Sequence, residues 1–155
     1  MKFIGIIPAR YASTRFPGKP LADMNGKPMI QRVYEQVKDV LDSVCVATDD
    51  IRIENAVKTF GGQVVMTSDQ HRTDRCYEAY QKIGEGYDVI VNIQGDEPFI
   101  HPEQIQTIKT CFADANTQIA TLVKPFRSDD DFESTLFNPN SPKVVLNKNN
   151  EARDF

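Results

Sequence analysis

Three basic side chains lie within ten positions near the N-terminus. They are Arg10, Arg15 and Lys19, and no acidic residue lies among them. Residues 1–32 hold six basic residues and one acidic residue, whereas the whole chain has a net charge of −4. A basic segment in an acidic protein favours an anionic ligand over a loop that is merely solvated. We therefore interpret residues 10–19 as a cradle for a triphosphate.

The basic segment is too short for a nucleic-acid partner, which would need a stripe of phosphate contacts. The sequence contains no Gly-x-x-x-x-Gly-Lys-Ser/Thr loop, so Arg and Lys side chains must supply the positive charge. We expect Ser13 and the backbone of Ala9 and Arg10 to help seat the phosphates and the base. The sequence pI of about 5.2 argues against a partner on an anionic membrane, and no apolar run approaches the eighteen or so residues of a membrane span. The N-terminus begins with an apolar strand pattern and not with a basic segment and a cleavage site, so we expect no signal peptide.

A carboxylate follows the clearest apolar run of the chain. Residues 88–94 predict a buried central strand, and Gly95 and Asp96 follow it directly. The carboxyl ends of parallel strands share one edge, so Asp96 should lie beside the cradle that follows the predicted strand 3–7. A carboxylate beside a triphosphate needs a hard cation between them, and Mg²⁺ is typically held in this way. We predict Asp96 as a Mg²⁺ ligand; the alternative is a turn aspartate that accepts hydrogen bonds from backbone amides.

Two segments of the chain resemble the motifs of the 3-deoxy-manno-octulosonate (KDO) cytidylyltransferases, also called CMP-KDO synthetases. The first is Arg10-Tyr-Ala-Ser-Thr-Arg-Phe-Pro-Gly-Lys-Pro-Leu21, continued by Asn25-Gly-Lys-Pro-Met29, and the second is Gln94-Gly-Asp-Glu-Pro98. The segment 137–146 is similar to a third family pattern. The resemblance implies that CTP and KDO, a sugar acid, react to give CMP-KDO and pyrophosphate for lipopolysaccharide synthesis. A CMP-sialic-acid-type synthetase and a CTP-binding fragment without turnover are the alternatives.

The resemblance also implies roles for individual residues. Arg10, Arg15 and Lys19 would bind the triphosphate and stabilise the leaving pyrophosphate, and Asp96 would hold Mg²⁺. The same resemblance places Arg72, Thr73 and Arg75 on the base and ribose side. The predicted nucleotide ligands are Ala9, Arg10, Ser13, Arg15, Lys19, Arg72, Thr73 and Gln94.

The chain departs from the family pattern at two places. Family members read His-x-Ser-Gly-Thr-Asp-Arg where Arg72 here runs straight into Thr73. Either two residues are deleted, or a mobile segment is missing from the numbering, and we favour the second. Family members also continue beyond residue 155, and that part supplies much of the sugar-acid site, a second metal ligand and the dimer contacts. We therefore expect a domain that is incomplete at its C-terminus, and a homodimer only if the continuation exists.

The apolar patterns predict an α/β fold, Rossmann-like, with a mostly parallel sheet and helices on both faces. Strands are predicted at 3–7 (ended by Pro8), 44–47, 63–66, 88–94 and 118–124, and helices at 30–41, 51–60, 74–83, 102–112 and after 128–131. An aspartate after the second strand is expected to cap the next helix. A role for Asp49 beside the nucleotide is the alternative.

At 155 residues and 40% hydrophobic, the chain predicts a single nucleotide-binding domain over 1–155. Its three cysteines are Cys45, Cys76 and Cys111, with no Cys-x-x-Cys pair. We interpret them as buried free thiols, with Cys76 half-exposed, and not as a metal site. Free thiols suit a reducing cytoplasm, so we expect a cytoplasmic protein.

Overall fold

The computed structural model describes residues 1–13, 16–69, 72–84, 86–126 and 136–154. Contacts within the chain divide it into two compact units, residues 1–117 and residues 118–155. All elements that could position the predicted site belong to the first unit. The expectation of one domain over 1–155 stays a prediction.

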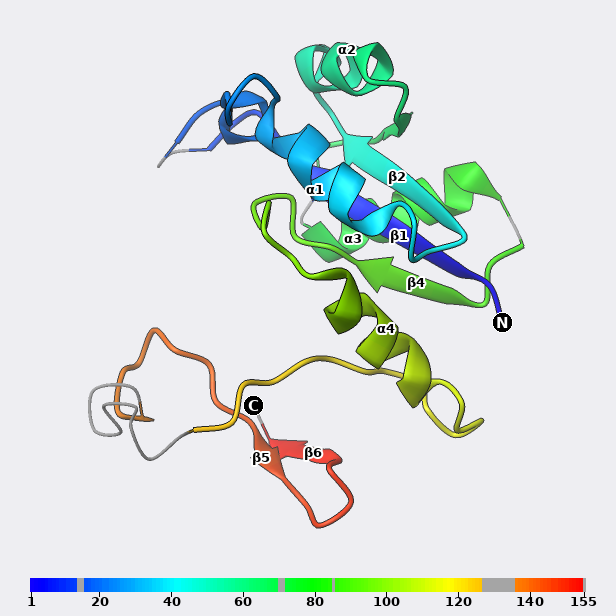
Figure 1. Ribbon diagram of the computed structural model, residues 1–155, viewed down its shortest axis with the longest axis vertical. Coiled ribbons are helices and arrows are strands. Elements are labelled where there is room, and N and C mark those ends of the chain that lie inside the picture. The colour runs from blue at the N-terminus through cyan, green and yellow to red at the C-terminus, as the bar shows by residue number, and fades with distance from the viewer. Residues whose placement is uncertain (14–15, 70–71, 85, 127–135, 155) are drawn as a thin grey trace. The chain divides into compact units, whose positions relative to one another are not determined.

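Four strands form a parallel sheet in the first unit, in the order β3-β2-β1-β4 (Figure 1). Their bounds are Phe3–Ala9 for β1, Ser43–Thr48 for β2, Gln63–Met66 for β3 and Val89–Asn92 for β4. The pairs β1–β2, β1–β4 and β2–β3 are all parallel. The carboxyl ends of these strands therefore lie along one edge, as the prediction of a mostly parallel sheet requires.

Helices cover both faces of this sheet, as predicted. They are α1 (Met29–Val37), α2 (Ile51–Thr59), α3 (Arg72–Ile83) and α4 (Pro102–Cys111). One apolar cluster joins α1, α2 and α4 to the face of the sheet that carries Ile7 and Val46. A second cluster joins α3 to the opposite face, which carries Ile4 and Ile6. Figure 1 shows α1 in front of the sheet and α3 behind it.

The prediction that Pro8 ends the first strand is wrong, because β1 continues to Ala9. The backbone N–H of Ile93 donates to the carbonyl of Ile6 at 3.0 Å, so Ile6 faces β4. Alternation along the strand turns Pro8 to the same side. Strand β4 ends at Asn92 and pairs with β1 only as far as Ile6. No ladder bond is therefore required from the nitrogen of Pro8, and a proline is tolerated there.

Two other strand predictions need correction. Residues 88–94 were expected to form a central strand, but β4 is shorter and lies at the end of the described strand order. Residues 118–124 were expected to form a strand, but the structure places no strand there, and Ile119 is 90% exposed. An apolar pattern predicts a strand, but it does not supply the neighbour with which that strand must pair.

Helix α3 starts two residues before its predicted start. It includes both Arg72 and Thr73. The expectation that the numbering passes over a missing segment at this point stays a prediction.

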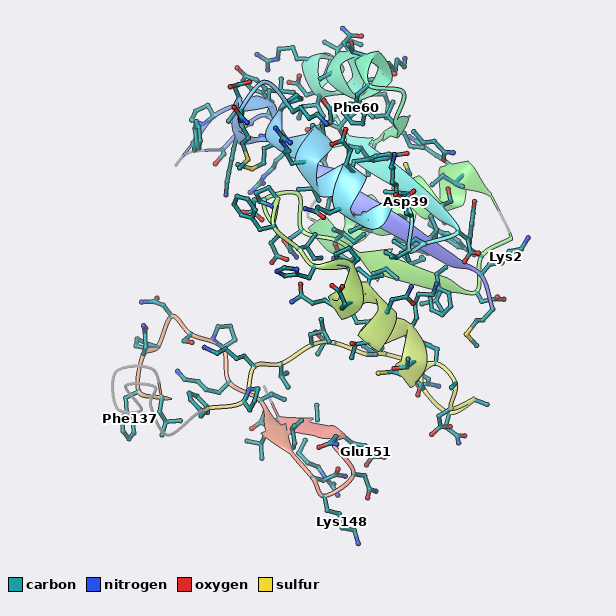
Figure 2. The ribbon with its side chains drawn as sticks, in the orientation of Figure 1. Lys2, Asp39, Phe60, Phe137, Lys148 and Glu151 are labelled. Carbon is teal, nitrogen blue, oxygen red and sulfur yellow. The ribbon has the colours of Figure 1, made fainter. Side chains whose placement is uncertain are left out.

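The second unit contains a small antiparallel hairpin made of β5 (Val145–Leu146) and β6 (Ala152–Asp154). The side chain of Asn147 holds its turn, since its Oδ1 atom accepts hydrogen bonds from the backbone N–H groups of Asn149 and Glu151, both at 2.9 Å. Lys148 and Glu151 lie at the tip of the hairpin (Figure 2). The helix predicted after 128–131 falls outside the described residues.

The cysteines agree only in part with expectation. All three are free thiols. Cys45 and Cys76 are buried, and burial raises the pKa of their thiols to about 12 and about 11. The half-exposed position expected for Cys76 and the buried position expected for Cys111 are both wrong, because helix α3 packs Cys76 on the sheet while Cys111 is exposed.

None of the helices in the described parts of the chain is long and apolar enough to span a membrane.

Candidate functional site

The carboxyl edge of the sheet brings Lys19 and Asp96 into contact. Lys19 opens a short 3₁₀ helix, η1 (Lys19–Leu21), and Asp96 lies in the turn that follows β4. The Nζ atom of Lys19 donates to the Oδ2 atom of Asp96 at 2.8 Å. A cation and a carboxylate that were predicted from two separate motifs thus meet at one point. An anionic ligand and a metal ion would each find one of their preferred partners there.

The position of Lys19 depends on the glycine before it. Gly18 has a φ of +70°, a left-handed conformation in which other residues are strained. Its backbone N–H donates to the carbonyl of Tyr11 at 2.9 Å, and a Cβ atom at Gly18 would lie 2.9 Å from the Tyr11 ring. The guanidinium of Arg52 lies 3.2 Å from the centre of the same ring. Tyr11 is thus packed between the loop backbone and the first turn of α2.

The position of Asp96 depends on a close approach of two backbones. A Cβ atom at Gly95 would lie 3.0 Å from the carbonyl oxygen of Pro8. The turn after β4 therefore lies directly against the end of β1, from which the basic loop begins. The backbone N–H of Glu97 donates to the carbonyl of Gln94 at 3.3 Å and closes this turn. Gln94, a predicted nucleotide ligand, is half-buried beside it.

The other residues of the predicted cradle differ in their exposure and in their contacts. Ala9 is buried at the end of β1, and Arg10 next to it is exposed. Arg10 forms no ion pair within the part of the chain that the structure describes. The Oγ atom of Ser13 accepts a hydrogen bond from the backbone N–H of Phe16 at 3.3 Å and so helps to shape the loop. Arg15 lies outside the described residues.

The residues predicted on the base and ribose side begin helix α3. The backbone of Arg72 opens the helix, but its side chain is outside the description, and Thr73 is exposed. Arg75 is different, because only 2% of its side chain is exposed. Its Nη1 atom donates to the Oδ1 atom of Asp49 at 2.7 Å and to the carbonyl of Ala9 at 3.2 Å. Arg75 thus binds groups of the protein itself at the end of β1 and β2.

The two aspartates after β2 have separate roles. Asp50 caps α2, since its Oδ1 atom accepts from the backbone N–H of Arg52 at 2.9 Å. Asp49 pairs with Arg75, and this hydrogen bond is the main reason why the pKa of Asp49 lies below its usual value. The pair joins residues 26 positions apart. Local sequence patterns do not predict this pair, because nothing near either residue in the sequence indicates its distant partner.

The residues present are compatible with a Mg²⁺ ion held by Asp96. Within the described ranges, no group of three or more His, Cys, Asp or Glu side chains could hold a metal. Mg²⁺ usually takes one or two carboxylates, with waters and substrate phosphates completing its shell. A single exposed carboxylate beside a phosphate cradle fits such a site. The metal assignment stays a prediction.

Comparisons with known proteins agree with the two motifs. The chain is 96% identical to the 3-deoxy-manno-octulosonate cytidylyltransferase of Parabacteroides distasonis, over 100% of the chain and 62% of that protein. It is 69% identical to the protein of the same name from Phocaeicola vulgatus, with the same coverage. The first alignment spans 157 positions, two more than the 155 residues of this chain. That difference agrees with two residues fewer in this chain than in its relative.

A solved structure of a CMP:2-keto-3-deoxy-manno-octonic acid synthetase complexed with CTP has the same fold. Its TM-score is 0.85 at 40% sequence identity, and the match covers 99% of this chain and 63% of that one. In the sequence comparisons, the chain spans about 62% of the length of each of the two curated relatives named above. The sequence profile of the family described as Cytidylyltransferase matches residues 4–155. This match over nearly the whole length shows that the chain belongs to the cytidylyltransferase family.

Proposed function

We propose that this chain forms the CTP-binding part of a CMP-KDO synthetase. The reaction would join CMP from CTP to the anomeric hydroxyl of KDO and release pyrophosphate. The contact between Lys19 and Asp96 carries the proposal, because two family motifs that lie 77 residues apart in sequence meet at 2.8 Å. The names of the relatives support the choice of CTP and KDO as substrates.

The residues of the cradle would act by charge and position. The nucleophile is the anomeric hydroxyl, which attacks the α-phosphorus in line while pyrophosphate leaves. Such a transfer asks little covalent chemistry of the protein, so the alignment of the reactants and the neutralisation of charge carry the rate. Arg10, Arg15 and Lys19 would bind the triphosphate and stabilise the negative charge that grows on the leaving group.

We propose that Asp96 holds Mg²⁺ when CTP is bound. The ion would supply positive charge between the carboxylate and the phosphates and so lower the repulsion that faces the nucleophile. In the structure described here, the ammonium of Lys19 neutralises the same carboxylate. Lys19 therefore keeps Asp96 at the edge of the sheet and beside the cradle.

The remaining predicted ligands complete the proposed nucleotide site. The end of β1 at Ala9, the loop at Ser13 and the turn at Gln94 lie along the same carboxyl edge. Arg72 and Thr73 would approach from the first turn of α3. We assign these residues to the phosphates, the base and the ribose.

We further propose that the protein is cytoplasmic and binds neither nucleic acid nor membranes. The buried free thiols of Cys45 and Cys76 support a reducing compartment. A homodimer of the longer protein is also proposed. Light scattering on a size-exclusion column would measure its mass.

The test of the proposed reaction is pyrophosphate release with CTP, KDO and Mg²⁺. We expect the Lys19→Ala and Asp96→Asn variants each to lose on the order of 100-fold in rate. The control is Lys58→Ala, which removes an exposed ion pair with Glu54 on α2, away from the cradle. Full activity of either site variant would remove that residue from the mechanism.

Two further outcomes distinguish the alternatives. Release of pyrophosphate with sialic acid in place of KDO would identify sialic acid as the acceptor of the same transfer reaction. Binding of CTP without release of pyrophosphate, whichever acceptor is supplied, would reduce the function of these 155 residues to nucleotide binding.

A further inference from the structure

A buried guanidinium lies at the carboxyl edge of the sheet, where the cradle begins. Among the described residues that are buried, Arg75 carries a charge. It lies in the first turns of α3. A buried charge is costly unless it is paired and hydrogen-bonded. The role of Arg75 can therefore be inferred from the groups with which it pairs.

Those partners are the ends of two neighbouring strands. The Nη1 atom of Arg75 donates both to Asp49, the residue after β2, and to the carbonyl oxygen of Ala9, the last residue of β1. Ala9 is paired in register with Thr48, which precedes Asp49. One side chain from α3 thus ties the ends of β1 and β2 together, directly below the point where the loop leaves the sheet.

The bond to the Ala9 carbonyl has a direct effect on Arg10. A peptide unit is planar, so fixing the carbonyl of Ala9 also fixes the direction of the N–H of Arg10. The start of the cradle is then determined by Arg75 and not by the free rotation of an exposed loop. The next residue, Tyr11, accepts a hydrogen bond from Gly18 at 2.9 Å, which extends this order towards Lys19.

Core stability alone does not require such a pair. Replacing a buried ion pair with apolar residues of similar size is often neutral or stabilising. The rest of this sheet is held by apolar side chains on both faces. A buried pair at the one edge that carries the basic loop therefore fits a role in positioning that loop.

We propose that Arg75 and Asp49 are positioning residues for the triphosphate cradle, acting through the Ala9 carbonyl on Arg10. This proposal rests on the proposed function, because it assumes that the cradle binds CTP. Under this proposal Arg75 orients the nucleotide site through the protein backbone, a different role from the base and ribose contact that the resemblance implies.

The first test compares the affinity for CTP in the presence of Mg²⁺ among four versions of the 155-residue chain, by calorimetric titration. They are the unchanged chain, Asp49→Asn, Arg10→Ala and the double variant. Asp49→Asn keeps the shape of the side chain but removes the charge, and we expect about tenfold weaker binding, which is about 1.4 kcal/mol. Glu54→Gln is the matched control, because it removes an exposed carboxylate that pairs with Lys58. Its affinity should not change.

The double variant separates positioning from general destabilisation. If Asp49 acts through Arg10, then Asp49→Asn should weaken binding by less than about twofold once Arg10 is already alanine. A further tenfold loss in the double variant would show that the two effects are independent. That result would overturn the proposal.

A second measurement needs no ligand. The amide of Gly18 donates to Tyr11, so its hydrogen exchange reports the order of the cradle. We expect Asp49→Asn to raise this exchange rate about tenfold, while the amide of Ile6, within β1, keeps its rate. An unchanged rate at Gly18 would overturn the inference. Failure of the unchanged chain to bind CTP would instead overturn the proposed function, and the exchange rates would still decide the role of Asp49 and Arg75.

Discussion

The basic loop depends on single residues whose backbone or side chain no other residue replaces easily. Gly18 adopts a left-handed conformation against the Tyr11 ring, and Gly95 lies against the carbonyl of Pro8. These two glycines allow the backbones that carry Lys19 and Asp96 to approach the end of β1. The charged groups of the site are therefore placed by residues that carry no charge.

We predict that Gly18→Ala destabilises the chain more than Gly26→Ala does. Both glycines have positive φ, +70° and +81°, so each alanine should cost about 1–2 kcal/mol in backbone strain. At Gly18 the new Cβ atom would also lie 2.9 Å from the Tyr11 ring, whereas at Gly26 it would meet nothing within 4 Å. Urea unfolding of both variants measures the difference. Equal losses would show that the contact with Tyr11 does not constrain the loop.

We also predict that Lys19→Ala changes stability little while it changes ligand binding strongly. The side chains of Lys19 and Asp96 are 38% and 40% exposed, and an exposed ion pair contributes only about 0–1 kcal/mol to stability. The melting temperature should therefore stay close to that of the unchanged chain. A large fall would mean that Lys19 serves the fold, and its effect on pyrophosphate release could then not be assigned to the site.

The elements around the site are joined by side chains that anchor loops to helices. The loop between β3 and α3 is held by Glu78, which accepts hydrogen bonds from the backbone N–H of Ser68 at 3.0 Å and its hydroxyl at 2.6 Å. Lys82 pairs with Glu78 at 2.8 Å and donates to the carbonyl of Met66 at 2.8 Å. This network fixes the approach of the chain to the first turn of α3.

The network predicts a pH dependence that is specific to Glu78. The hydrogen bonds from Lys82 and Ser68 lower the pKa of Glu78 from 4.5 to about 2. Because the pKa of Glu78 is lower in the folded state, its ionised carboxylate stabilises the fold at pH values above its ordinary pKa of 4.5. This stabilisation is lost as the pH falls through the folded-state pKa of about 2. Glu78→Gln should therefore melt below the unchanged chain at pH 7, and the gap should shrink between pH 4.5 and pH 2. A gap that is constant over this range would contradict the account.

The prediction of elements from sequence succeeded where the pattern was local. Apolar spacing located the helices and the first three strands, and the motif residues at the ends of β1 and β4 were expected on one edge. The errors arose where the extent or existence of a strand depended on the strand beside it in the sheet. Pro8 stays in β1 because β4 ends early, and residues 118–124 form no strand in the described structure. The pair of Arg75 with Asp49 was also missed, because it joins distant parts of the chain.

At the scale of the whole molecule, the proposed nucleotide site lies within the first compact unit. The described residues assigned to it run from Ala9 to Asp96, and the unit covers residues 1–117. The chain has a net charge of −4, yet its first 32 residues are strongly basic, so an anion is attracted to one place. The second unit carries the hairpin of β5 and β6 and none of the residues assigned to CTP.

The most direct test of the account is a calorimetric titration of this chain with CTP in the presence of Mg²⁺. We predict saturable binding by the unchanged chain and a loss of at least about tenfold in affinity for Lys19→Ala, with Lys58→Ala unaffected. Binding that is absent, or that is equally strong in Lys19→Ala, would contradict the claim that the two motifs meet to form a nucleotide site.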